Sequence, residues 1–370
     1  MRRFTSIFIV FVAAAALASA VRLNPRLTTR RVEQHLVPAA PTETMPPLLA
    51  FTTVTFGGFR GLAADLLWLR ATDLQERGEY FELVQIADWI TKLEPRFTSV
   101  WAFQAWNMAY NISVLLNDPA ERWRWVRAGV SLLRDNGLRY NPGSAGLHYE
   151  LAWLFFHKLG QGYDQAHLFY KRAWAEEMTA LFGGAQPDYA RLLADPERLR
   201  VLREVYKLDP TAMQRVDAAY GPLDWRLPDA HAIYWAVQGK SYAKAFDDAR
   251  LDRMIFQALA DAFKHGRLLT KLNEAEFTIG PNLDLLPRVD AQYLATARAY
   301  PNDDTIKTSH ANFLKEAVVM LYRSHRHQAA GACLTELAKL YPATVKTNNL
   351  DAFVAEVLAA QARAGLPVRP

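Results

Sequence analysis

The stretch GEYFELVQIADWITKLEP, residues 78–95, carries a helical pattern of apolar residues between a glycine and a proline. The apolar residues recur at the spacing that places them on one face of a helix: Leu83, Ile86, Ala87, Ile90 and Leu93. Gly78 suits a reversal of the chain. Pro95 ends the helix, because proline lacks an N–H group and clashes with the turn behind it. The stretch is therefore predicted to be a bounded amphipathic helix that follows a turn.

Further helical segments surround this stretch and pair with one another. Residues 62–77 carry apolar side chains at Leu62, Leu66, Leu67, Leu69 and Leu74 and are expected to form a hairpin with the stretch, across Gly78. The remaining predicted hairpins pair residues 99–115 with 120–138, and residues 145–159 with 163–178. The sequence from Asp118 to Glu121 is a strong helix start, because aspartate caps free N–H groups and proline suits the first helical position.

The pattern of the opening stretch returns 247 residues later, in HRHQAAGACLTELAKLYP at 325–342. The equivalent positions hold His325, His327, Ala330, Leu334, Leu337, Leu340 and Pro342, and Cys333 takes the position of Ile86 on the apolar face. These features resemble the tetratricopeptide repeat, a helix–turn–helix unit of about 34 residues. The resemblance covers roughly residues 60–175 and 310–342. Pro95 and Pro142 are 47 residues apart, so one unit carries longer helices or an insertion.

The resemblance implies an all-α fold, a TPR-like α-solenoid of antiparallel helical hairpins. We assign TPR-like repeats to residues 56–178 and a C-terminal TPR-like pair to residues 301–370. Between them, residues 179–300 form a divergent helical region with an irregular insertion. Its predicted features are a helix start at Asp195, a helix capped by Asp229, and irregular or short β structure over 266–290.

The amino terminus carries an export or membrane-insertion signal. Arg2 and Arg3 precede an uncharged stretch of 18 residues, 4–21. Two interpretations stay open: a signal peptide cleaved after Ala20, or an uncleaved membrane anchor. Residues 1–21 are therefore predicted to be a signal peptide or anchor, and residues 22–55 a spacer that contains prolines. The folded body is expected to be extracytoplasmic, in a periplasm-like compartment.

Composition excludes several classes of protein. The net charge is +5, the hydrophobic fraction is 51%, and no run of like charges resembles an arm that binds nucleic acid. Nucleic acid is therefore not expected as a partner. Cys333 is the only cysteine, which rules out an intramolecular disulfide.

No catalytic, metal or cofactor motif is recognised in the sequence. His325 and His327, like His148 and Glu150, are separated by two positions and diverge on a helix, so neither pair predicts a metal site. We predict no enzyme activity, no cofactor and no metal.

The leading functional hypothesis is a membrane-tethered or exported scaffold that binds other proteins. The first helices of the hairpins are expected to form the inner, partner-binding surface. Its candidate residues are Trp68, Arg70, Trp101, Gln104, Asn107 and Asn111.

A second cluster of aromatic and charged residues lies at 221–240. Its members are Asp224, Trp225, Arg226, His231, Tyr234 and Trp235. One interpretation is a ligand pocket of an extracytoplasmic binding protein or enzyme. The other is a buried Asp–Arg pair that braces a break between two helical blocks. A third hypothesis for the whole chain is a structural subunit of an envelope complex.

Overall fold

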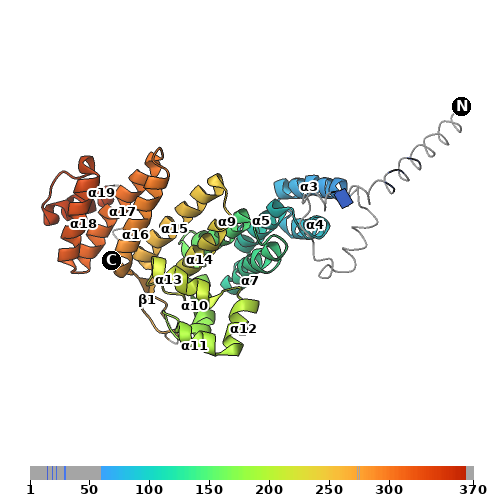
Figure 1. Cartoon of the computed structure of the whole chain (residues 1–370), viewed down its shortest axis with the longest axis horizontal. Coiled ribbons are helices and arrows are strands. Elements are labelled where there is room, and N and C mark those ends of the chain that lie inside the picture. Colours follow the sequence, from blue (N-terminus) through green and yellow to red (C-terminus); the bar gives the residue numbers. More distant parts are fainter. Residues whose placement is uncertain are drawn as a thin grey trace. The chain divides into compact units, whose positions relative to one another are not determined.

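The computed structural model describes residues 15, 19, 22, 29, 30, 60–272, 274 and 276–363. Figure 1 shows that this part of the chain is built almost entirely from helices, which confirms the predicted all-α class. Internal contacts divide the chain into two compact parts, residues 1–112 and residues 113–370, called unit 1 and unit 2 here. The boundary lies inside the predicted repeat region 56–178.

Unit 1 contains a helical hairpin and a third helix that ends in a π-helix. Its elements are α3 (Arg60–Arg77), α4 (Tyr80–Leu93), α5 (Thr98–Trp106) and the π-helix η2 (Asn107–Ile112). α3 packs along α4 because both helices bury a stripe of small and aliphatic side chains: Ala64, Ala71, Leu74, Leu83, Ala87 and Ile90. The hairpin predicted from the opening stretch is confirmed.

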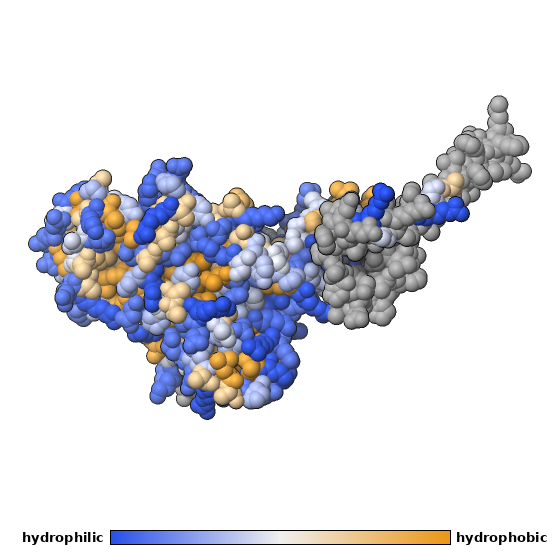
Figure 2. All heavy atoms as spheres, viewed as in Figure 1, coloured by the Kyte–Doolittle hydropathy of each residue, from blue (hydrophilic) through white to orange (hydrophobic). Residues whose placement is uncertain are grey.

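The outer face of α3 carries three leucines of the apolar pattern in residues 62–77. Leu62, Leu66 and Leu69 are exposed by 57%, 61% and 67%, so they do not pack inside the hairpin. The alanines of α3 allow α4 to approach closely, and the hairpin is closed through them and Leu74. Figure 2 shows hydrophobic residues at the surface over α3.

The turn between α3 and α4 is repeated in unit 2, between α17 (Asp304–Arg323) and α18 (His327–Leu340). Gly78 and His325 hold equivalent positions, and both have a left-handed backbone, with φ of 73° and 58°. The next N–H donates to the matching carbonyl in each turn: Glu79 to Leu74 and Arg326 to Leu321, both at 2.9 Å. The two hairpins therefore share backbone geometry as well as the apolar pattern, and Cys333 is buried at the position of Ile86.

The first part of unit 2 runs through alternating α- and π-helical segments. They are α6 (Ser113–Leu115), α7 (Pro119–Ser131), η3 (Leu132–Gly137), α8 (Leu138–Tyr140), α9 (Ala145–Trp153), η4 (Leu154–Gly160) and α10 (His167–Phe182). The helix start predicted at Asp118 is confirmed, because its carboxylate accepts from the N–H of Ala120 at 3.2 Å. α10 begins later than the predicted residue 163.

Aspartate side chains cap the first three of the next four helices. They are α11 (Tyr189–Ala194), α12 (Pro196–Glu204), α13 (Pro210–Tyr220) and α14 (Pro228–Lys240). The Asp195 carboxylate accepts from the N–H of Arg198 at 3.1 Å, as predicted. The cap predicted at Asp229 is wrong: Leu227 is the N-cap residue, and Asp229 lies buried inside the first turn.

The last part of unit 2 returns to stacked helices after a short β ladder. Its elements are α15 (Ala245–His265), β1 (Arg267–Leu268), β2 (Ile279–Gly280), the 3-10 helix η5 (Leu283–Leu285), α16 (Leu286–Ala299), α17, α18, the 3-10 helix η6 (Pro342–Thr344) and α19 (Leu350–Arg363). β1 and β2 pair antiparallel, with Arg267 opposite Gly280. The short β structure predicted within 266–290 is confirmed.

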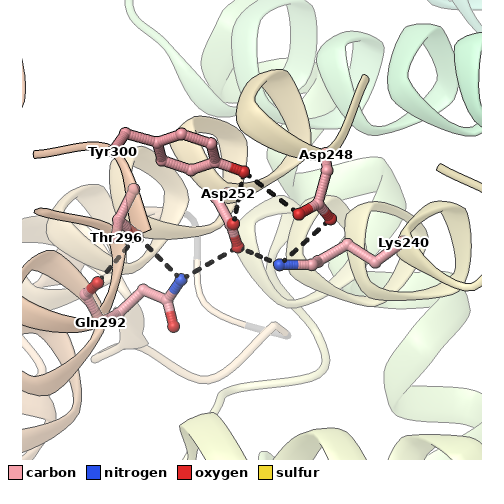
Figure 3. A network of polar contacts seen from close by, with 6 residues as sticks. All are labelled: Lys240, Asp248, Asp252, Gln292, Thr296 and Tyr300. Atoms are coloured by element: carbon pink, nitrogen blue, oxygen red, sulfur yellow. Dashed lines mark hydrogen bonds and ion pairs between the residues drawn. The ribbon is translucent and has the colours of Figure 1, made fainter. Parts of the chain in front are cut away.

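A polar network joins α14, α15 and α16 (Figure 3). Its members are Lys240, Asp248, Asp252, Gln292, Thr296 and Tyr300. The Lys240 ammonium pairs with both aspartates, and the Tyr300 hydroxyl donates to Asp248 at 3.1 Å. Burial lowers the pKa of Lys240, but the ion pairs with Asp252 and Asp248 outweigh burial and raise it. The network therefore links three successive helices through ion pairs and hydrogen bonds.

The predicted signal or anchor at 1–21 and spacer at 22–55 fall almost wholly outside the described residues. None of the helices in the described part of the chain combines the length and apolar composition needed to cross a bilayer.

Candidate functional site

All six residues predicted to bind a partner belong to unit 1, and three of them are buried in its interior. Trp101, Gln104 and Asn107 are buried, and each donates a hydrogen bond to a backbone carbonyl. The bonds run from Trp101 Nε1 to Pro95 O at 2.9 Å, from Gln104 Nε2 to Val84 O at 3.3 Å, and from Asn107 Nδ2 to Tyr80 O at 3.2 Å. The expectation of an exposed inner surface is wrong for these three, because their donors link α5 and η2 to the preceding segments.

The other three predicted binding residues reach the surface or its edge. The exposed Arg70 guanidinium pairs with Asp73 at 2.8 Å and with Glu82 at 3.0 Å. The half-buried Trp68 ring packs between aromatic rings of unit 1. Asn111 donates to the Asn107 side chain at 2.9 Å. A binding role for these residues stays a prediction.

The predicted cluster at 221–240 is brought together, and it is buried. Trp225 is 0% exposed, and its ring lies 5.8 Å from the ring of His231 and 6.1 Å from that of Tyr234. The Trp235 ring packs edge-on against Tyr234 at 5.2 Å. The ring nitrogen Nε2 of His231 lies 2.9 Å from the carbonyl oxygen of Trp225.

Two charged residues of this cluster, Asp224 and Arg226, form an ion pair. The Arg226 guanidinium donates two hydrogen bonds to Asp224, at 2.8 and 2.7 Å. The second Asp224 oxygen also accepts from the N–H of Leu268, at 3.2 Å, and so ties the loop before α14 to β1. This geometry is that of a brace between helical blocks, and none of the six residues lines either of the clefts described next.

One cleft, of about 490 Å³, lies against α7, η3, α10 and the end of α12. Its charges compensate one another within the protein. Arg127 pairs with Glu177 at 3.1 Å, and Arg134 pairs with its neighbour Asp135 at 2.7 Å. The Tyr206 hydroxyl also donates to Glu177, at 2.9 Å. Few polar groups are therefore left for a ligand.

A second cleft, of about 600 Å³, opens between η4, α15, α16 and α17; we call it the aromatic cleft. Two of its helices face it with the same i, i+3, i+4, i+7 stripe. The stripes are Gln257, Ala260, Asp261 and Lys264 on α15, and Ser309, Asn312, Phe313 and Glu316 on α17. One face of each helix thus supplies a wall of the aromatic cleft.

The remaining walls are aromatic. Trp153 stacks on His157 with ring centroids 4.8 Å apart, and His157 stacks on Tyr163 at 5.2 Å. On the other side, Tyr293 lies 5.8 Å from Phe313. Part of the first wall belongs to the π-helix η4, a wider helix type that occurs frequently at functional sites. Burial and the nearby Lys158 ammonium lower the pKa of His157, which favours a neutral ring.

Side-chain amides in the aromatic cleft have unused hydrogen-bonding capacity. The side chains of Gln161, Gln257 and Asn312 make no hydrogen bond to any residue that the structure describes, whereas those of Gln104 and Asn107 in unit 1 do. Each amide offers a carbonyl acceptor and two N–H donors. Such groups match the alternating N–H and C=O groups of an extended peptide backbone.

Sequence reasoning missed the aromatic cleft. The signal was present in α15 and α17, where polar residues interrupt the apolar pattern at helical spacing. In the sequence alone, such a stripe indicates a solvent-exposed helix face. Only the fold shows that residues near 157, 257 and 312 line one cleft.

Similarity to known proteins assigns no family to this chain. No protein-family model matches the sequence, and a search of curated proteins finds no match.

Proposed function

We propose that the chain is a TPR-like helical-repeat scaffold that binds an extended segment of a partner protein in the aromatic cleft. The observation that carries this proposal is the set of unpaired amides, Gln161, Gln257 and Asn312, between aromatic walls. Aromatic side chains bury large apolar area at low entropic cost, and the amides can bond the peptide backbone. The repeated turn at Gly78 and His325 supports the resemblance to tetratricopeptide repeats.

The uncharged stretch at 4–21 supports a membrane-tethered or exported location for this scaffold. Anchored in this way, the body is extracytoplasmic and its partner is a protein of the same compartment. No enzyme activity and no cofactor belong to the proposal.

The proposal is tested by selecting peptides that bind the purified full-length chain in detergent, from a displayed library of random sequences. The affinity of a selected peptide is then measured by fluorescence anisotropy for the wild type and for the double variant Gln257→Ala/Asn312→Ala. Each hydrogen bond lost removes about 1 kcal/mol, so the pair should weaken binding about 30-fold.

The matched control is Gln165→Ala/Asn136→Ala, which removes two exposed amides outside the aromatic cleft. Its affinity should equal that of the wild type. Equal binding by the wild type and the cleft variant, for every selected peptide, would refute the proposal.

A further inference from the structure

The charges that line the aromatic cleft are not balanced. Lys264 on α15 is paired with Glu316 on α17. Asp261 is left with a single ion-pair partner among the described residues, His265 at 3.4 Å, which is charged only when protonated. The Asp261 side chain keeps 14% of its surface exposed and lines the cleft. A carboxylate in such a partly enclosed site favours a strong cationic partner.

A second carboxyl, that of Asp229, interacts electrostatically with Asp261. Asp229, in the first turn of α14, is only 5% exposed. Its Oδ1 has no hydrogen-bond partner in the described structure. That oxygen lies against Gly160, where an added Cβ would approach it to 3.4 Å, and Gly160 directly precedes Gln161 of the cleft. An unsatisfied buried oxygen is costly and is uncommon in folded proteins.

The two carboxyls act on each other electrostatically. Burial and the Asp261 charge raise the pKa of Asp229 well above its ordinary value, and Lys171 opposes this shift only in part. Asp229 is therefore stabilised in its protonated form. A cation placed here would be favourable to both groups.

We propose, on the basis of the function proposed above, that the bound segment carries a lysine or arginine whose cation lies against Asp261. A long basic side chain can also cover apolar wall with its methylene groups while its charge reaches the carboxylate. Asp261 thus acts as the specificity-determining residue of the cleft.

The test uses the peptides selected on the full-length chain. Those that depend on Gln257 and Asn312 should share a lysine or arginine at one position. Changing this residue to glutamine should weaken binding to the wild type at least tenfold. The same change should leave binding to Asp261→Asn nearly unaltered, because the carboxylate that reads the cation is already gone. The matched control Asp304→Asn removes an exposed carboxylate outside the cleft and should behave as the wild type.

Two other results separate this inference from the proposed function. Cleft-dependent peptides that lack a common basic residue, or whose basic residue can be changed without loss, would overturn the inference and leave the function standing. Binding of every peptide that is insensitive to Gln257→Ala/Asn312→Ala would overturn both. If Asp261→Asn weakens the glutamine peptide as much as the basic peptide, Asp261 acts structurally, and the inference fails.

Discussion

Replacing Trp225 with alanine should lower the free energy of unfolding of unit 2 by about 3 to 5 kcal/mol, the range for a buried tryptophan truncated to alanine. Trp225 is fully buried, so its truncation to alanine leaves a cavity in the core. The change also removes a hydrogen bond of 2.8 Å from its Nε1 to the half-buried carboxyl of Asp217. Hydrogen exchange of the amides of α14 measures the effect within unit 2 alone.

Two controls make this expectation specific. Trp225→Phe keeps most of the ring volume and loses the N–H donor, so its cost should be smaller. Trp89→Ala truncates a tryptophan that is 47% exposed and should change stability by about 0.5 kcal/mol or less. A loss below about 1 kcal/mol for Trp225→Ala would contradict a bracing role for the 221–240 cluster and reopen the pocket interpretation.

Replacing Asp164 with asparagine should destabilise unit 2 by about 3 to 5 kcal/mol, because it leaves a buried ammonium without its counter-ion. Asp164 accepts from Lys158 at 2.5 Å, from Arg122 at 3.1 Å and from the Tyr170 hydroxyl at 3.2 Å. The Lys158 side chain is 3% exposed, so water cannot replace the lost carboxylate. Urea unfolding at pH 7 measures the loss.

The same group gives a pH dependence with a defined sign. Burial raises the pKa of Asp164, but hydrogen bonds from Lys158 and from the N–H of Ala166 outweigh burial and hold it below its ordinary value of 3.8. A depressed folded-state pKa contributes stability above the unfolded pKa, and this stability is lost as the pH falls through the folded value. The difference between wild type and Asp164→Asn should therefore shrink below about pH 4.

Asp164→Leu/Lys158→Met tests whether the cost comes from the unpaired charge. Removing both ions should recover part of the stability lost in Asp164→Asn, because the Lys158 ammonium is no longer left without its counter-ion, while Arg122 still loses Asp164. The exposed pair of Asp304 and Lys307 offers a comparison: Asp304→Asn should cost less than about 1 kcal/mol. Equal losses for Asp164→Asn and Asp304→Asn would contradict the importance of burial.

Helix ends were predictable because their chemistry is local. Asp118 and Asp195 each precede a proline and supply an acceptor to the free N–H groups of their helices. Gly78 and His325 mark turns whose hydrogen bonds close within a few residues. Such features depend on neighbours in the sequence, so a single sequence contains the required information.

Long-range packing was not predictable in the same way. The pattern in 62–77 contains enough leucines for an apolar face, but it does not show that the alanines and Leu74 take the inside while Leu62, Leu66 and Leu69 face outwards. The donors of Gln104 and Asn107 meet carbonyls 20 and 27 residues away, on a different segment. Such distant partners determine which polar side chains are buried and hydrogen-bonded in the interior.

The aromatic cleft is an extreme case of this limit. Its walls come from helices around residues 157, 257, 293 and 312, and each stripe is unremarkable when read alone. The prediction of a partner surface on first helices therefore selected residues of unit 1 that are partly buried, while the unpaired amides lie in unit 2.

Photo-crosslinking tests directly whether the aromatic cleft holds a peptide. Tyr163, at the cleft and 79% exposed, can be replaced by the photo-crosslinking residue benzoylphenylalanine, with Phe246, 75% exposed and outside the cleft, as the matched position. We expect a selected peptide to be captured from position 163 and not from position 246, and excess unlabelled peptide to abolish capture. Equal capture at both positions, or capture from 246 alone, would contradict it.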